Sequence, residues 1–291
     1  MDYLSIQELV ELAESENKRI SDLIINDQAK QLELPRETVF AQMEQNYQVM
    51  LDAIETGINS SQRSASGLSG GDAAKLHQAV EQGKTIGGGV LDRVLVKAIA
   101  VAEVNACMGK IVAAPTAGSC GILPAVLSTI MDEHKLPREE VVSALFTAAG
   151  VGMVIAKKAS ISGAEGGCQA ECGSAAAMAA AALVELMGGT PRQVAHATAI
   201  SIKSVLGLVC DPVAGLVEVP CVKRNAMGAA NALMAAELAL AGIESKIPVD
   251  EVISTMKSIG DMMVPALKET AQAGLATTPT GKKLAKTIFG K

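Results

Sequence analysis

The six cysteines of this 291-residue chain are the residues whose surroundings point most directly to chemistry. Cys168, Cys210 and Cys221 each lie among glycine, proline and polar residues, as metal ligands held on loops do. Their spacings, 42 residues from 168 to 210 and 11 residues from 210 to 221, match none of the compact Cys-x-x-Cys runs of ferredoxins and zinc sites. The residues alone therefore leave three roles open, namely metal ligand, reactive thiol and small buried side chain.

The other three cysteines are expected to have structural roles. Cys107 lies inside a predicted apolar helix, which predicts a small buried side chain. Cys120 comes at the start of a predicted helix, where the pKa of a thiol can fall, but no histidine partner is evident nearby, so we expect it to line a pocket. Cys172 would share a helix face with Cys168, yet its place inside the helix suits a packing residue.

Four polar, glycine-bearing loops precede predicted helices and are the expected walls of a site. They cover residues 60–71, 115–121, 160–167 and 209–220. Helix N-termini and bare glycine backbone bind anions such as a carboxylate or a phosphate. If the loops converge within an apolar helical shell, they form one polar pocket.

The elements that must position these loops are predicted to be helices. The chain is 49% hydrophobic and only 2% aromatic, and alanine, its main small apolar residue, favours helices that pack closely. A short stretch near residues 110–114 is the one candidate strand. We predict an all-α fold with a single multi-helix domain over residues 1–291, on which an amphipathic helical pair over about residues 1–57 packs. One further helix is expected to begin at residue 72, and another is expected to follow the loop 115–121 and to end near residue 134. The remaining helices are expected over 90–108, 137–159, 168–187, 191–206, 222–241, 249–259 and 262–273, followed by a polar tail.

Charge and hydropathy argue against two classes of partner. The net charge of -6 disfavours nucleic acid, which would need a basic face. The longest apolar run, Ser174 to Met187, is shorter than the roughly 20 residues of a membrane span. The first residues read as an acidic amphipathic helix rather than a signal peptide. We therefore expect a cytoplasmic chain, with no nucleic acid, no membrane and no structural disulfides.

Five stretches of the sequence form longer motifs, and the last of them is far too long to match by chance. They are Ser66–Asp72, Pro115–Gly118, Ala159–Gly163, Gly166–Glu171 and Gly207–Ala226. Together they closely resemble the α subunit of the iron–sulfur-dependent L-serine dehydratase family, also called L-serine deaminase. The resemblance covers essentially the whole chain.

The resemblance implies a cofactor and its ligands. Members of the family hold a four-iron, four-sulfur cluster with three cysteines, which fall here on Cys168, Cys210 and Cys221. The fourth iron then stays open and acts as a Lewis acid on the substrate hydroxyl. The implied reaction converts L-serine to pyruvate and ammonia.

Within that chemistry, several polar residues become candidates for the substrate site. Glu171, one turn past Cys168, is the candidate catalytic residue that binds the ammonium group or moves protons, and capping or orienting the loop is its equal alternative. Possible charge partners are Lys75, Arg224 and Asn225. The candidate substrate-binding residues are Ser66, Ser69, Thr116 and Ser162.

The chain departs from the single-chain members of the family at two points. Those members carry a further cysteine near the C-terminus that can occupy the fourth iron, whereas no cysteine follows Cys221 here. They also carry an N-terminal β domain with a Ser-His-Thr motif, which this sequence lacks. The two-chain members place that domain on a separate β subunit. We therefore expect a β subunit as partner and an oligomeric assembly.

Three rival functions follow from the same residues. A pyridoxal phosphate enzyme would need a Schiff-base lysine, for which Lys84 before Gly87-Gly-Gly89 is the nearest match, but the helical pattern disfavours it. A cluster-dependent L-cysteine desulfidase would use the same cysteines. A non-catalytic helical scaffold would not need four polar glycine loops.

Overall fold

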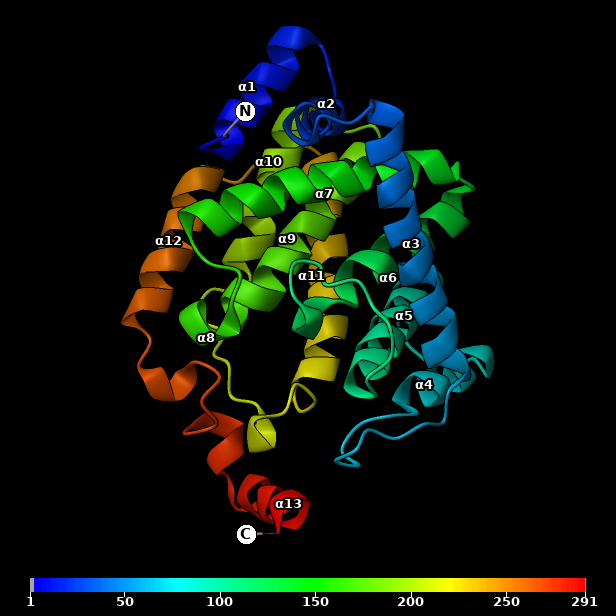
Figure 1. Ribbon diagram of the computed structural model, residues 1–291, viewed down its shortest axis with the longest axis vertical. Helices are drawn as coiled ribbons and strands as arrows, with labels where there is room; N and C mark the ends of the chain where they lie inside the picture. The colour runs from blue at the N-terminus through cyan, green and yellow to red at the C-terminus, as the bar shows by residue number, and fades with distance from the viewer. Residues whose placement is uncertain (1–2, 291) are drawn as a thin grey trace.

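Thirteen α-helices and four short 3-10 turns make up most of residues 3–290, the part of the chain that the computed structural model describes (Figure 1). No β-strand occurs among these residues, and an isolated parallel bridge pairs Cys210 with Lys268. The all-α prediction is therefore confirmed, whereas the candidate strand near residues 110–114 is irregular backbone. The α-helices are α1 Ile6–Glu16, α2 Ile20–Leu32, α3 Arg36–Asn59, α4 Asp72–Glu81, α5 Gly89–Ala106, α6 Ile122–His134, α7 Arg138–Lys158, α8 Gly163–Gly166, α9 Cys168–Leu186, α10 Pro191–Lys203, α11 Cys221–Leu240, α12 Val249–Met262 and α13 Pro279–Phe289. The 3-10 turns are η1 Ala117–Ser119, η2 Val213–Gly215, η3 Pro265–Leu267 and η4 Gly274–Thr277.

Helix α9 is the centre of the molecule. It contacts α6, α7, α10 and α11, and Figure 1 shows it crossing the interior between them. Residues 175–182 are alanine except for Met178, and all of them are buried. Because alanine side chains are small, the axes of the neighbouring helices can approach α9 closely. The alanine-rich core expected from composition therefore surrounds this helix.

The N-terminal region contains three helices, so the prediction of a pair is wrong. The first predicted helix is broken between α1 and α2, because Asn17 adopts a left-handed conformation with a φ of 49°. A second left-handed residue, Glu33, ends α2 before Pro35 opens α3. The helical periodicity of apolar side chains continues across the break at Asn17, so the sequence pattern does not reveal it. The three helices contact α10, α7 and α5 respectively.

The C-terminal region also differs from the prediction. The helix expected over residues 262–273 is replaced by the η3 turn and irregular backbone, because Glu269 and Ala271 have φ values of 62° and 55°. The expected polar tail is instead helix α13. Thr278 caps this helix by accepting a hydrogen bond from the Gly281 N–H at 3.0 Å, and a proline occupies its first turn.

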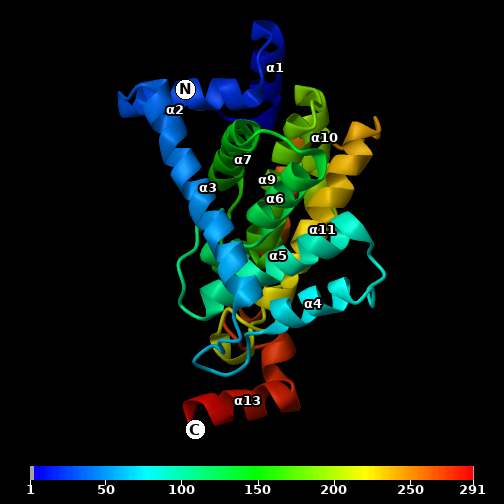
Figure 2. The same cartoon turned by 90° about the vertical axis from the view of Figure 1, so that its right-hand side faces the viewer.

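The polar loops gather at one end of the bundle. In both views the loop before α4 (cyan) and the loop before α11 (yellow) lie at the end opposite α1 and α2 (Figures 1 and 2). Ser66 of the first loop donates its hydroxyl to Glu218 of the other at 2.7 Å. Asn225 at the start of α11 accepts the Gly121 N–H at 2.9 Å and so ties the second loop to the same region.

Helix α7 is the described helix that has the length and apolar composition of a membrane span. Of its most apolar window, 67% is buried inside the protein. The helix contacts α2, α3 and α9. Burial in this core accounts for its apolar character.

Candidate metal and substrate site

Two of the three predicted ligands begin helices, and the third lies on the loop between them. Cys168 is the first residue of α9, Cys221 is the first residue of α11, and Cys210 lies in the bridge described above. Gly167 turns the chain into α9 with a φ of 76°, and a Cβ there would lie 2.9 Å from the Leu208 carbonyl oxygen. This position therefore requires glycine. The positive ends of α9 and α11 favour thiolates at their first residues.

These three thiols are buried and interact electrostatically with one another. Cys168, Cys210 and Cys221 are 1%, 2% and 6% exposed. Burial, followed by the charge on Cys168, raises the pKa of Cys210 and raises the pKa of Cys221 to about 12. The charge on Cys168 thus acts on both other predicted ligands, although they lie 42 and 53 positions away in the sequence.

Cys172 stands closer to this centre than the sequence predicted. Its Sγ lies 3.3 Å from the Sγ of Cys168, and this hydrogen bond lowers the pKa of Cys168. With Glu171, the two cysteines form a group whose potential ligand atoms all lie within 4.8 Å of one another. Cys172 is also 2% exposed and packs in the main core, as expected of it. The i, i+4 spacing from Cys168 was the sequence signal for this proximity.

Glu171 is held by the second loop. Its Oε1 accepts a hydrogen bond from the Thr116 hydroxyl at 2.6 Å, and a Cβ on Gly118 would lie 2.5 Å from the same oxygen. Burial raises the pKa of Glu171, the hydrogen bond from Thr116 lowers it, and the charge on Glu269 raises it. Two predicted site residues, Thr116 and Glu171, are therefore in direct contact.

Sequence reasoning missed Glu269, which belongs to the segment after α12. If Gly163 carried a Cβ, that atom would lie 3.1 Å from the Cys210 Sγ, 3.3 Å from the Glu269 Oε2 and 3.5 Å from the Glu171 Oε2. Gly163 thus leaves a small space lined by one thiol and two carboxylates. The segment was predicted to be a helix, so nothing in the pattern directed Glu269 toward the cysteines.

Arg224 and Asn225 take up positions beside the cysteines, as expected of charge and polar partners. Arg224 donates to the Val209 carbonyl at 2.8 Å and to Asp211 at 2.9 Å. Asn225 donates to the Gly118 carbonyl at 2.8 Å. Lys75, the third residue of that group, is exposed and pairs instead with Asp72 on the same helix.

The first loop has most of its polar groups bonded within the protein. The Glu103 carboxylate, which is 4% exposed, occupies the N-terminus of α4. It accepts three backbone N–H groups at 2.9 to 3.1 Å, from Gly70, Asp72 and Ala73. An internal carboxylate therefore already fills the anion site that this loop and helix create.

The predicted serines differ in their surroundings. The Ser66 hydroxyl is bonded to Glu218, as described above. Ser69 is 1% exposed, and its hydroxyl has no hydrogen-bond partner among residues 3–290. Ser162 is half-buried immediately before α8, and its N–H donates to the Ser160 hydroxyl at 3.0 Å.

The two remaining cysteines, Cys120 and Cys107, differ in their burial. Cys120 packs in an apolar cluster with Val101 and Val104, and burial raises its pKa to about 12. Cys107 caps the C-terminus of α5 and is half-buried, not fully buried as expected. Lys84, the lysine that a pyridoxal phosphate enzyme would need, is exposed after α4.

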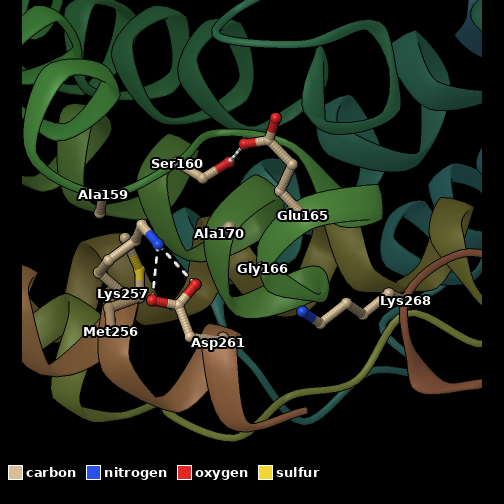
Figure 3. A pocket seen from close by; sticks show the side chains of 10 residues that line it. Ala159, Ser160, Glu165, Gly166, Ala170, Met256, Lys257, Asp261 and Lys268 are labelled. Carbon is tan, nitrogen blue, oxygen red and sulfur yellow. Dashed lines mark hydrogen bonds and ion pairs between the residues drawn. The ribbon is translucent and has the colours of Figure 1, made fainter. Parts of the chain in front are cut away.

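A separate cavity of about 270 Å³ lies between α8 and α12. Figure 3 shows its wall, where Ser160 donates to Glu165 and Lys257 pairs with Asp261. Lys268 also lines this cavity, although its neighbour Glu269 faces the cysteines. Adjacent residues of one segment therefore serve two different sites.

The residues present fit a metal centre with sulfur ligands. Thiolates are the preferred ligands of iron–sulfur clusters, and buried cysteines meet here from α9, α11 and the loop between α10 and α11. The bare Cα of Gly163 leaves room beside Cys210. The helix N-termini and Arg224 supply positive charge for an anionic group. The fold and the site therefore define a class of protein: an all-helical protein with a thiol-rich centre at one end of its helix bundle.

The comparisons with known proteins identify its family. A family model described as "Serine dehydratase alpha chain" matches residues 15–276, and the chain belongs to this family. The chain is 52% identical over 288 residues to the "Probable L-serine dehydratase, alpha chain" of Bacillus subtilis (strain 168), covering 99% of this chain and 96% of that one. It is 44% identical to the "L-serine dehydratase, alpha chain" of Peptoniphilus asaccharolyticus, over 96% of this chain and 95% of that one.

A longer relative shows the same similarity over part of its length. The "L-serine dehydratase TdcG" of Escherichia coli (strain K12) is 39% identical over 288 residues. The alignment covers 94% of this chain but only 62% of that protein. The resemblance stated from the five sequence motifs is thus confirmed along nearly the whole chain.

Proposed function

We propose that this chain is the catalytic α subunit of an L-serine dehydratase, a lyase that converts L-serine to pyruvate and ammonia. The observation that carries the proposal is the group of Cys168, Cys172 and Glu171, with Cys210 beside the same Gly163 space as Glu171, in a chain of this family. The names of the relatives from Bacillus and Peptoniphilus support the substrate.

The cofactor that suits this reaction is a four-iron, four-sulfur cluster. Cys168, Cys210 and Cys221 would hold it, and no cysteine follows Cys221 in the sequence. When bound, the cluster supplies an iron that acts as a Lewis acid toward the β-hydroxyl of serine. Cys172 supports the centre through its hydrogen bond to Cys168.

The protein residues then have to bind serine and move a proton. Loss of the α-proton and of the β-hydroxyl as water gives 2-aminoacrylate, which tautomerises to an imine and is hydrolysed to pyruvate and ammonia. Glu171 is the candidate to bind the ammonium group or to move the proton, and Thr116 fixes its orientation. Ser66, Ser69 and Ser162 are candidates for the substrate carboxylate, which requires the Ser66–Glu218 contact to open.

A second subunit completes this proposal. The three histidines lie on helices and have other contacts or positions: His77 pairs with Glu81 on α4, His134 ends α6, and His196 on α10 accepts the Ser245 N–H at 3.2 Å. The longer relative from Escherichia coli has sequence outside the aligned part. We infer that a β subunit supplies further active-site groups, that the assembly is an oligomer, and that it works in the cytoplasm.

The test is anaerobic reconstitution with iron and sulfide, with and without a β subunit, followed by an assay of pyruvate from L-serine. The proposal expects iron-dependent activity that disappears together with the visible colour on exposure to air. Turnover of L-cysteine in preference to L-serine would favour the desulfidase. Activity that survives iron removal and is abolished by borohydride would favour pyridoxal phosphate.

A further inference from the structure

We propose that Glu269 is a second carboxylate of the substrate site and that, with Glu171, it holds the ammonium group of the amino-acid substrate. This inference rests on the proposed function and names a residue that determines how the substrate is oriented and selected. It concerns the segment after α12, which carries none of the motifs singled out in the sequence.

The backbone of this segment is fastened to the loop that bears Cys210. The Cys210 N–H donates to the Leu267 carbonyl at 2.9 Å, and the Glu269 N–H donates to the Cys210 carbonyl at 2.8 Å. Glu269 itself has a φ of 62°, a left-handed conformation that is uncommon for a residue with a long side chain. The two hydrogen bonds hold that conformation, and it sends the side chain toward the thiol.

The carboxylate of Glu269 faces the space beside Gly163, which Cys210 and Glu171 also border. The position that a Gly163 Cβ would occupy is 3.3 Å from the Glu269 Oε2 and 3.5 Å from the Glu171 Oε2. The same position is 3.1 Å from the Cys210 Sγ. The two carboxylates therefore approach one another beside a predicted cluster ligand.

Nothing in the described chain neutralises these two carboxylates as an ion pair. Arg224, the nearest cation on α11, forms its salt bridge with Asp211 at 2.9 Å. Among residues 3–290, neither Glu171 nor Glu269 forms a salt bridge. After burial and the Thr116 hydrogen bond, the charge on Glu269 raises the pKa of Glu171 and the charge on Arg224 lowers it by less. The two half-buried carboxylates therefore repel each other, and a bound ammonium group between them removes that repulsion.

The arrangement makes a specific demand on the ligand. An amino acid presents an ammonium group to the two carboxylates, whereas a hydroxy acid of the same carbon skeleton presents only a neutral hydroxyl. A hydrogen bond involving a charged group contributes enough that its loss lowers affinity by roughly 10- to 100-fold. Glu269 therefore favours L-serine over its hydroxy analogue, glycerate.

The experiment uses the reconstituted enzyme with its β subunit and the variant Glu269→Gln. We expect the KM for L-serine to rise about 10- to 100-fold, while the inhibition constant of glycerate stays the same or falls. Iron content and the visible spectrum are expected to match the unchanged enzyme. Glu269→Asp, which keeps the charge, is expected to recover part of the affinity.

The matched control is Lys268→Gln, which removes the neighbouring charge from the cavity of Figure 3 and keeps the backbone hydrogen bonds of Cys210 to Leu267 and Glu269. An unchanged KM in Glu269→Gln overturns the inference, and so does an equal loss of affinity for L-serine and glycerate. If the unchanged enzyme itself fails to turn over L-serine, the proposed function fails, which is distinguishable from either result. Loss of iron in Glu269→Gln alone would assign the residue a structural role and overturn the ammonium site.

Discussion

The hydroxyl of Thr116 donates a hydrogen bond of 2.6 Å to the carboxylate of Glu171. This contact joins the turn that precedes α6 to the first turn of α9, across 55 residues of sequence. Thr116 is therefore in a position to fix both the orientation and the ionisation of the carboxylate nearest to Cys168.

Replacement of Thr116 by valine is expected to slow the reaction about 10-fold or more, because a hydrogen bond to a charged group contributes roughly 1.5–3 kcal/mol. The hydrogen bond lowers the pKa of Glu171 against burial, which raises it. Loss of this hydrogen bond raises the pKa of Glu171 further. The acidic limb of the plot of kcat/KM against pH should therefore move to higher pH. Measurement of that profile checks the prediction, and Thr116→Ser serves as the control that keeps the hydroxyl. A profile that moves to lower pH contradicts it.

The second prediction concerns the small space beside Gly163 that Cys210, Glu171 and Glu269 line. In Gly163→Ala the new methyl group would lie 3.1 Å from the Cys210 Sγ and 3.3 Å from the Glu269 Oε2. We expect reduced iron incorporation after anaerobic reconstitution and a stability change of about 1 kcal/mol or less. Ala164→Ser, at the exposed next residue of α8, is the control and should incorporate iron normally. Normal iron content in Gly163→Ala would show that the cluster does not need this space.

The fold could be predicted from the sequence where the helical pattern of apolar residues was strong and uninterrupted. Alanine content and helical periodicity predicted α9 and α11 to within a residue or two of their ends. The break at Asn17 was missed because a single left-handed residue leaves the apolar pattern on both sides unchanged. The segment around Glu269 was read as a helix because its left-handed residues are not glycine.

The site was only partly predictable for a similar reason. Loop composition and family resemblance directed attention to Cys168, Cys210 and Cys221. The contact between Cys210 and residues 267–269 is made by backbone hydrogen bonds, which leave no signature in residue type. Glu269 could therefore be found only from the folded chain.

The buried pair Arg224–Asp211 gives a prediction about stability. Asp211, 4% exposed, accepts hydrogen bonds from Arg224 at 2.9 Å and from the Leu275 N–H at 2.8 Å. Asp211→Ala leaves the partly exposed Arg224 guanidinium without its ion pair, which is expected to cost about 3 kcal/mol in the free energy of unfolding. Chemical denaturation followed by circular dichroism measures it. The exposed pair Glu14–Arg192 is the comparison, and Glu14→Ala should change stability little.

Glu185 in α9 gives a prediction that depends on pH. Burial raises the pKa of this carboxyl above its usual value, so the folded state binds more protons than the unfolded state between the two pKa values. Stability must then fall as pH rises through that interval. Glu185→Gln should therefore raise the melting temperature at pH 8 and should raise it less at pH 5.

The control for Glu185 is Glu139→Gln, which replaces an exposed carboxylate on α7 and should leave the melting temperature nearly unchanged at both pH values. An equal shift of Glu185→Gln at pH 5 and pH 8 would contradict the assigned cause. A lower melting temperature at pH 8 would do so as well.

The assignment of Cys168, Cys210 and Cys221 as cluster ligands is tested most directly by iron and sulfide content. Each is replaced by serine in turn, and the variants are reconstituted anaerobically beside Cys107→Ser and Cys120→Ser. We expect each of the three ligand variants to lose most of its iron, its sulfide and its visible absorption, while both controls retain them. Full iron and sulfide content in any of the three ligand variants would contradict the assignment.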